Sequence, residues 1–170
     1  MAKQKFSVLI GAVLAFTLVG GSVYVLFADD PQPVAIGTLH EFPEVSLEQI
    51  DGREKMKISG GGVKLVAFVS DECHTCHEAM DALITSEILN LDDFGIYYVW
   101  KDKPKSVPNS VQHEKIHNLI LNERKLDNDT YGWSMTPRFY MLDAENKVIW
   151  DGLGFSDSIQ VTMERKAEEA

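Results

Sequence analysis

The most informative segment of the chain is Val63-Lys-Leu-Val-Ala-Phe-Val-Ser-Asp-Glu-Cys-His-Thr-Cys-His77. Its beginning, residues 63–69, is almost continuously apolar, which is typical of a buried strand. The polar residues 70–72 predict a turn. From Cys73 onward, apolar side chains recur at helical spacing as far as Ile88, so a helix is predicted to begin at or near Cys73. This segment therefore predicts a strand and a helix joined by a short loop, with two cysteines at the helix start.

The two cysteines have the spacing of a reactive pair rather than of a structural crosslink. A disulfide between Cys73 and Cys76 closes a very small loop and removes little chain entropy. Such a pair is more typical of redox chemistry, or of metal or cofactor attachment. At a helix N-terminus, free N–H groups and the helix dipole stabilise a thiolate on Cys73. Cys76 lies one turn further in and is predicted to be more buried, so Cys73 is expected to attack and Cys76 to resolve.

The rest of the chain carries the patterns of further strands and helices. They are a strand at 95–100, a helix at 110–125, a strand at 135–143 opened by a proline, a turn at 144–147, a strand at 148–150 and a final helix from about 156 to 167. The two strands around the turn suggest a hairpin. The order strand, helix, strand, helix, hairpin, helix predicts an α/β fold with helices covering a sheet.

The N-terminal part has the pattern of a membrane anchor. Residues 6–28 contain no charged side chain, and about 20 apolar helical residues cross a bilayer. Lysines before this run and two aspartates after it predict a cytoplasmic N-terminus at 1–5 and an exported domain. Residues 29–36 read as a linker and 37–170 as one domain. The protein is therefore predicted in the cytoplasmic membrane, as a single-pass signal-anchor protein whose domain faces the periplasm or the extracellular side.

A cleaved signal peptide is the alternative for the same run. The apolar region of a signal peptide is usually about 7–15 residues and ends in an Ala-x-Ala-like site. The run here is longer, and Leu26-Phe27-Ala28 is a poor site. Both alternatives export the domain.

Composition limits the function classes. The chain has 170 residues, 45% of them apolar, and a net charge of −10. The only charges before Asp29 are two lysines, so residues 29–170 carry −12. This acidity and the absence of basic stripes argue against a nucleic-acid partner, because phosphate contacts need clustered cations. Recurring apolar runs argue against disorder.

A Cys-x-x-Cys between a buried strand and a helix, followed much later by Thr136-Pro137 at the start of a hairpin, resembles the thioredoxin fold. The closest resemblance is to its membrane-anchored bacterial branch, the ResA/TlpA-like thiol–disulfide oxidoreductases, with the MauD-like proteins nearby. It covers about residues 37–155. In that branch an extra β-hairpin precedes the thioredoxin core, and residues 41–47 and 51–58 resemble that hairpin. An insertion also precedes the proline, and the predicted helix at 110–125 would fill it.

The resemblance implies roles for individual residues. Cys73 matches the nucleophile, Cys76 the resolving cysteine, and Pro137 the cis-proline that faces the disulfide. The backbone of Thr136 matches the residue that pairs with an extended substrate. The implied partners are proteins with cysteines or disulfides and a redox partner that recycles the pair, and no cofactor is implied.

Three departures from the family's pattern surround the cysteines. Glu72 replaces the usual Trp, Ala67 replaces the acid of thioredoxins proper, and His74-Thr75 replaces the common Gly-Pro. We expect Glu72 and His74 to modulate the pKa of the Cys73 thiol, with opposite effects on the redox couple. The direction of electron flow therefore stays open. By resemblance, apocytochrome c cysteines are one candidate substrate, and the disulfides of a specific periplasmic enzyme are another.

Two further motifs give alternatives. Cys73 to His77 also matches the C-x-x-C-H signature of c-type haem attachment. A haem needs an apolar pocket and would consume both thiols, so we interpret His77 as an exposed residue of the first helical turn. A c-type haem electron carrier remains the alternative function, and a non-catalytic thioredoxin-fold assembly factor is the third.

His113 to His117 matches the H-E-x-x-H zinc-protease pattern. Lys115 places a charge where such a helix is normally apolar, and no convincing third ligand follows. We therefore interpret this segment as the solvated face of a surface helix and predict no metal site.

Overall fold

The computed structural model describes residues 41–52, 54–58, 61–108, 112–122 and 124–170. The predicted anchor at 6–28 and linker at 29–36 lie outside these ranges. Within them, no helix has both the length and the apolar character needed to cross a membrane.

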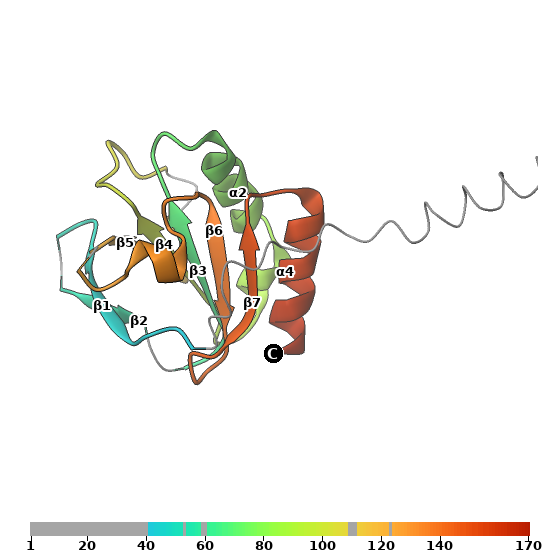
Figure 1. Ribbon diagram of the computed structural model, residues 1–170. Coiled ribbons are helices and arrows are strands. Elements are labelled where there is room, and N and C mark those ends of the chain that lie inside the picture. Colours follow the sequence, from blue (N-terminus) through green and yellow to red (C-terminus); the bar gives the residue numbers. More distant parts are fainter. Residues whose placement is uncertain (1–40, 53, 59–60, 109–111, 123) are drawn as a thin grey trace, which may run out of the picture. The chain divides into compact units, whose positions relative to one another are not determined.

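A mixed sheet forms the centre of the described chain (Figure 1). Its strands are β1 (Val45–Gln49), β2 (Met56–Ile58), β3 (Lys64–Val69), β4 (Gly95–Trp100), β5 (Ile116–Ile120), β6 (Arg138–Leu142) and β7 (Val148–Leu153). Their spatial order is β2-β1-β5-β4-β3-β6-β7. Strands β3, β4 and β5 are parallel, whereas the remaining neighbours pair antiparallel. The α/β class predicted from the sequence is therefore confirmed.

Strand β3 is an interior strand that lies between β4 and β6 and is covered on both faces. All six of its residues are buried, which explains its nearly continuous apolar sequence. Leu65, Ala67 and Val69 face one core cluster, and Val66 and Phe68 face the other. This alternation is the two-residue period of a strand.

The two faces of the sheet are covered by different elements (Figure 1). The helices are α2 (His74–Ile84), the 3-10 helix η1 (Glu87–Asn90), α3 (Asn128–Tyr131) and α4 (Asp157–Glu169). Helices α2 and α4 pack into the cluster around Leu65, while the short α3 packs through Tyr131 into the cluster around Phe68. The apolar faces of the sheet are thus buried under one layer on each side.

Helix α2 begins where the sequence predicts, with Cys73 as its N-cap residue. It ends earlier than the apolar spacing suggests, because Thr85 donates its hydroxyl to the carbonyl oxygen of Ala82 (2.9 Å) and the chain turns. Ile88 therefore belongs to η1, which Ser86 caps. The predicted hairpin and final helix are confirmed as β6–β7 and α4.

The predicted helix at 110–125 is wrong. Residues 116–120 instead form β5, which pairs parallel with β4 and antiparallel with β1. Ile116, Leu119 and Ile120 have a spacing that also suits a helix, but the open edge of β4 provides ladder partners, and the core buries Ile116 and Leu119. The only helix that the described ranges hold between η1 and Pro137 is α3.

At the other side of β5, strand β1 joins the sheet. Val45 of β1 lies opposite Ile58 of β2, and Glu48 of β1 lies opposite Ile120 of β5. This places Glu48 at the same sheet edge as the end of β5.

Candidate active site

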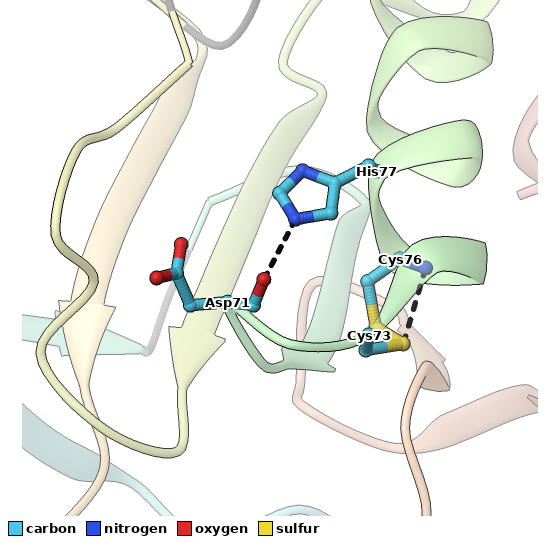
Figure 2. Close-up of a disulfide and its surroundings, with 4 residues drawn as sticks. All are labelled: Asp71, Cys73, Cys76 and His77. Atoms are coloured by element: carbon cyan, nitrogen blue, oxygen red, sulfur yellow. Dashed lines mark hydrogen bonds between the residues drawn. A yellow bond between two sulfur atoms is a disulfide. The ribbon is translucent and has the colours of Figure 1, made fainter.

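The two cysteines lie at the edge where the parallel strands end. Strand β3 stops at Val69, three residues form the connecting loop, and Cys73 starts α2. A disulfide joins Cys73 and Cys76, whose Cα atoms are 5.2 Å apart (Figure 2). The carboxyl edge of a parallel sheet is a common position for functional groups in α/β proteins.

The first turn of α2 provides a backbone donor to the Cys73 sulfur. The Cys76 amide donates to Cys73 Sγ at 3.1 Å (Figure 2), and the same amide lies 3.0 Å from the Cys73 carbonyl oxygen. An N–H group in this position stabilises negative charge on the sulfur once the disulfide is reduced. The arrangement follows directly from using a cysteine as the helix N-cap.

The cysteines differ in exposure. Cys73 is half-buried, whereas Cys76 is fully buried in the cluster between β3, α2 and α4. The predicted difference in burial is therefore confirmed. Cys76 is therefore shielded from an external reactant by packed side chains, whereas part of Cys73 is accessible.

The burial of His77 differs from the prediction made from the sequence. This residue is half-buried rather than exposed, and its Nε2 lies 3.0 Å from the carbonyl oxygen of Asp71 (Figure 2). When Nε2 carries the proton, it donates to that oxygen and ties α2 to the loop before Cys73. The pattern C-x-x-C-H contains no signal for this contact, which depends on how the loop folds back beside the helix.

Glu72 and His74, the two predicted modulators, are both exposed. The side chain of His74 is 88% exposed, and its Nε2 lies 3.4 Å from a carboxylate oxygen of Glu78. The ring thus turns along the outer surface of α2, one helical turn onward. In this arrangement the imidazole contacts a carboxylate rather than the Cys73 sulfur.

Thr136 and Pro137 reach the same sheet edge from the other side of β3. Their peptide bond is cis, as the resemblance implies. Pro137 is buried and immediately precedes β6, whose first residue, Arg138, lies opposite Phe68 near the end of β3. Because β3 and β6 are antiparallel, the start of β6 lies beside the end of β3 and hence beside the loop to Cys73.

A buried charge next to Pro137 was not predicted. Arg138 is fully buried, forms an ion pair with Asp151 of β7, and its guanidinium lies 5.0 Å from the centroid of the Tyr140 ring. The Tyr140 hydroxyl donates to the carbonyl oxygen of Tyr131 (2.8 Å) in α3. These contacts join β6, β7 and α3 behind the proline. The sequence signal that indicates such a buried charge is a single arginine inside an otherwise apolar strand.

The H-E-x-x-H segment does not form a helix. His113 is exposed in the loop before β5, while His117 is half-buried on β5, with its ring 4.9 Å from that of Tyr97. Burial lowers the pKa of His117. Across the residues that the structure covers, no group of three His, Cys, Asp or Glu side chains is arranged to hold a metal ion.

No protein-family model and no curated protein matches this sequence. Solved structures do resemble the fold. A thiol:disulfide interchange protein from Bacteroides sp. is 19% identical, with 78% of this chain and 91% of that chain covered and a TM-score of 0.61. The thioredoxin domain of a thiol-disulfide oxidoreductase from Bacteroides vulgatus is 19% identical (76% and 96% covered, TM-score 0.56). StoA from Bacillus subtilis is 14% identical (72% and 96%, TM-score 0.53). The fold of the described chain is therefore thioredoxin-like.

Proposed function

We propose that this chain is a thiol–disulfide oxidoreductase that exchanges its Cys73–Cys76 disulfide with the cysteines of other proteins. The observation that carries the proposal is the placement of the pair at the start of α2, with Cys73 half-buried and Cys76 fully buried. A disulfide across so short a loop adds little stability, so its use is chemical. The likeness in fold to solved oxidoreductases supports the same conclusion.

The exchange proceeds in two steps. In the reduced protein, the Cys73 thiolate attacks one sulfur of a substrate disulfide, and the other substrate sulfur leaves as a thiolate that takes a proton. Cys76 then loses its proton and attacks Cys73 Sγ, so that the substrate's second sulfur leaves and the Cys73–Cys76 disulfide forms. Two electrons pass to the substrate. The reverse sequence oxidises a substrate dithiol, and a separate redox partner restores the pair.

A trapping experiment tests the proposal. Cys76→Ser removes the resolving thiol, so a mixed disulfide between Cys73 and a disulfide-containing protein should accumulate on non-reducing gels. Cys73→Ser is the matched control, because it also leaves one thiol but a buried one, and it should capture nothing. Faster alkylation of Cys76 than of Cys73 in the reduced protein would contradict these roles.

The reduction potential of the pair decides the direction of electron flow. A value near about −120 mV would identify an oxidase and one near about −270 mV a reductase. A Soret absorbance band in the purified protein would instead identify a c-type haem carrier.

We also propose that residues 6–28 anchor the protein in the cytoplasmic membrane and that the domain works outside the cytoplasm. The support is the length of the charge-free run and the lysines that precede it. The full-length protein should stay in the membrane fraction after a carbonate wash. A mature N-terminus at Asp29 would show that the segment is removed.

A further inference from the structure

A pocket of about 350 Å³ opens at the same sheet edge as the disulfide. It is lined by Glu48, Lys101, Ile120, Leu121, Asn122 and Arg124. Lys101 directly follows β4, and its amide donates to the Val69 carbonyl oxygen (2.9 Å) at the end of β3. Leu121 directly follows β5, and its backbone amide donates to the carbonyl oxygen of Trp100 (2.8 Å) at the end of β4. We call this cavity the Lys101–Arg124 pocket.

The spacing of the strand ends sets the scale on which one bound peptide reaches both the pocket and Cys73. Neighbouring strands in a sheet are about 4.8 Å apart, so the end of β5 lies about 10 Å from the end of β3. The loop from β3 leads directly to Cys73. An extended peptide rises about 3.3 Å per residue, so about three residues of substrate span the separation of these strand ends.

The pocket presents two cations to solvent. Lys101 and Arg124 are both exposed, and within the part of the chain that the structure describes neither forms an ion pair. Asn122 adds an amide, and Glu48 is the one acid among the lining residues that the structure describes. Among the described lining residues, positive charge therefore exceeds negative charge, although residues 29–170 together carry −12. A negatively charged group is attracted here and repelled by the protein's overall charge, which favours one docking orientation.

The Lys101 side chain is linked to the segment that leads to the cis-proline. Its Nζ lies 5.8 Å from the centroid of the Trp133 ring, and Trp133 donates its indole N–H to the Leu126 carbonyl oxygen (2.9 Å). Two residues after Trp133, the side chain of Met135 is 42% exposed, directly before Thr136. A polypeptide that lies along this segment therefore passes an apolar side chain and reaches the ammonium group of Lys101.

We propose that the Lys101–Arg124 pocket binds an aspartate or glutamate side chain of the protein whose cysteine reacts with Cys73. This inference rests on the proposed function, and it adds a preference for substrates with an acidic residue about three positions from the reacting cysteine. Lys101 and Arg124 act as specificity residues and take no part in the bond exchange.

Peptide kinetics with the reduced full-length protein in a non-ionic detergent test the pocket. Each synthetic peptide carries one cysteine in a disulfide with a chromophoric thiol and either Glu or Gln three residues from that cysteine, on one side or the other. Release of the chromophore gives a second-order rate constant. We expect one Glu peptide to react about three- to tenfold faster than its Gln counterpart, and the ratio to fall at high salt.

Two double variants locate the preference. In Lys101→Gln/Arg124→Gln the ratio of Glu to Gln rates should fall to about one. Lys103→Gln/Lys105→Gln is the matched control, because it removes the same charge from two exposed lysines nearby that do not line the pocket. This control variant should keep the preference for the Glu peptide. Arg124→Gln alone gives a milder test, because it keeps the hydrogen bond from the backbone amide of residue 124 to Asn122 Oδ1. The ratio of Glu to Gln rates should then fall to a value between that of the wild type and one.

The outcomes separate the two proposals. If the wild type reacts with no peptide and with no small disulfide, the oxidoreductase function fails. If it reacts with Glu and Gln peptides at equal rates, the function stands and the pocket inference is overturned. Equal loss of the preference in both double variants would also overturn it, because the effect would then be one of total charge.

Discussion

Asp151→Asn should destabilise the protein through the arginine that follows the cis-proline. Arg138 is fully buried on β6, whereas the Asp151 side chain on β7 is 25% exposed and pairs with the guanidinium. The substitution keeps the size of the side chain and removes its charge. The guanidinium then stays in the core without the carboxylate that faces it.

The expected loss follows from the burial of the two partners. Removing one partner of a buried ion pair costs about 3–5 kcal/mol. Partial exposure of Asp151 allows some screening by water, and the guanidinium keeps its contacts with the ring and the hydroxyl of Tyr140. We therefore expect a loss of about 2–3 kcal/mol, or about 8–10 °C in the unfolding midpoint for a domain of this size.

Thermal and urea unfolding of the oxidised full-length protein measure this loss. Asp92→Asn is the matched control, because it removes the same charge from an exposed loop and should change stability by less than about 0.5 kcal/mol. Adding Arg138→Met to Asp151→Asn should recover part of the loss, since the core then no longer holds a guanidinium that has lost its carboxylate. A midpoint for Asp151→Asn equal to that of Asp92→Asn would refute the reasoning.

Two further predictions concern stability. Burial lowers the pKa of His117, so the unfolded chain binds its proton at higher pH than the folded chain does. Stability should therefore be lost as the pH falls below the pKa of this imidazole in the unfolded chain, about 6.5. The urea midpoint of His117→Gln should vary less between pH 7 and pH 5 than that of the wild type. An equal pH dependence of the two midpoints would count against this account. Gly62→Ala should be far more destabilising than Gly61→Ala, because a Cβ at Gly62 (φ +46°) would lie 1.5 Å from the Asp93 carbonyl oxygen, whereas one at Gly61 (φ +56°) meets nothing within 4 Å. Gly61→Ala should cost about 1 kcal/mol of backbone strain and Gly62→Ala about 3 kcal/mol or more in thermal unfolding, and equal midpoints would contradict this account.

The cysteine pair and its immediate frame could be predicted from the sequence because their determinants are local. An apolar run of strand length, a polar loop and a helical repeat starting at Cys73 each act over a few residues. The β6–β7 hairpin and the start of α4 at Ser156 depend on equally short-range patterns, a turn and a helix cap. The greater burial of Cys76 followed from its place one turn inside the helix.

Tertiary structure decided the features that depend on partners far away in the chain. Residues 116–120 have a spacing that suits a helix, yet they form β5 because β4 and β1 offer backbone partners on either side. The ion pair of Arg138 exists because the hairpin brings Asp151 beside it. The Lys101–Arg124 pocket combines side chains from the ends of three strands, and only the spatial order of those strands makes them neighbours. Local periodicity carries no information on strand order, because order is set by which sheet arrangement buries the most apolar surface and satisfies the backbone.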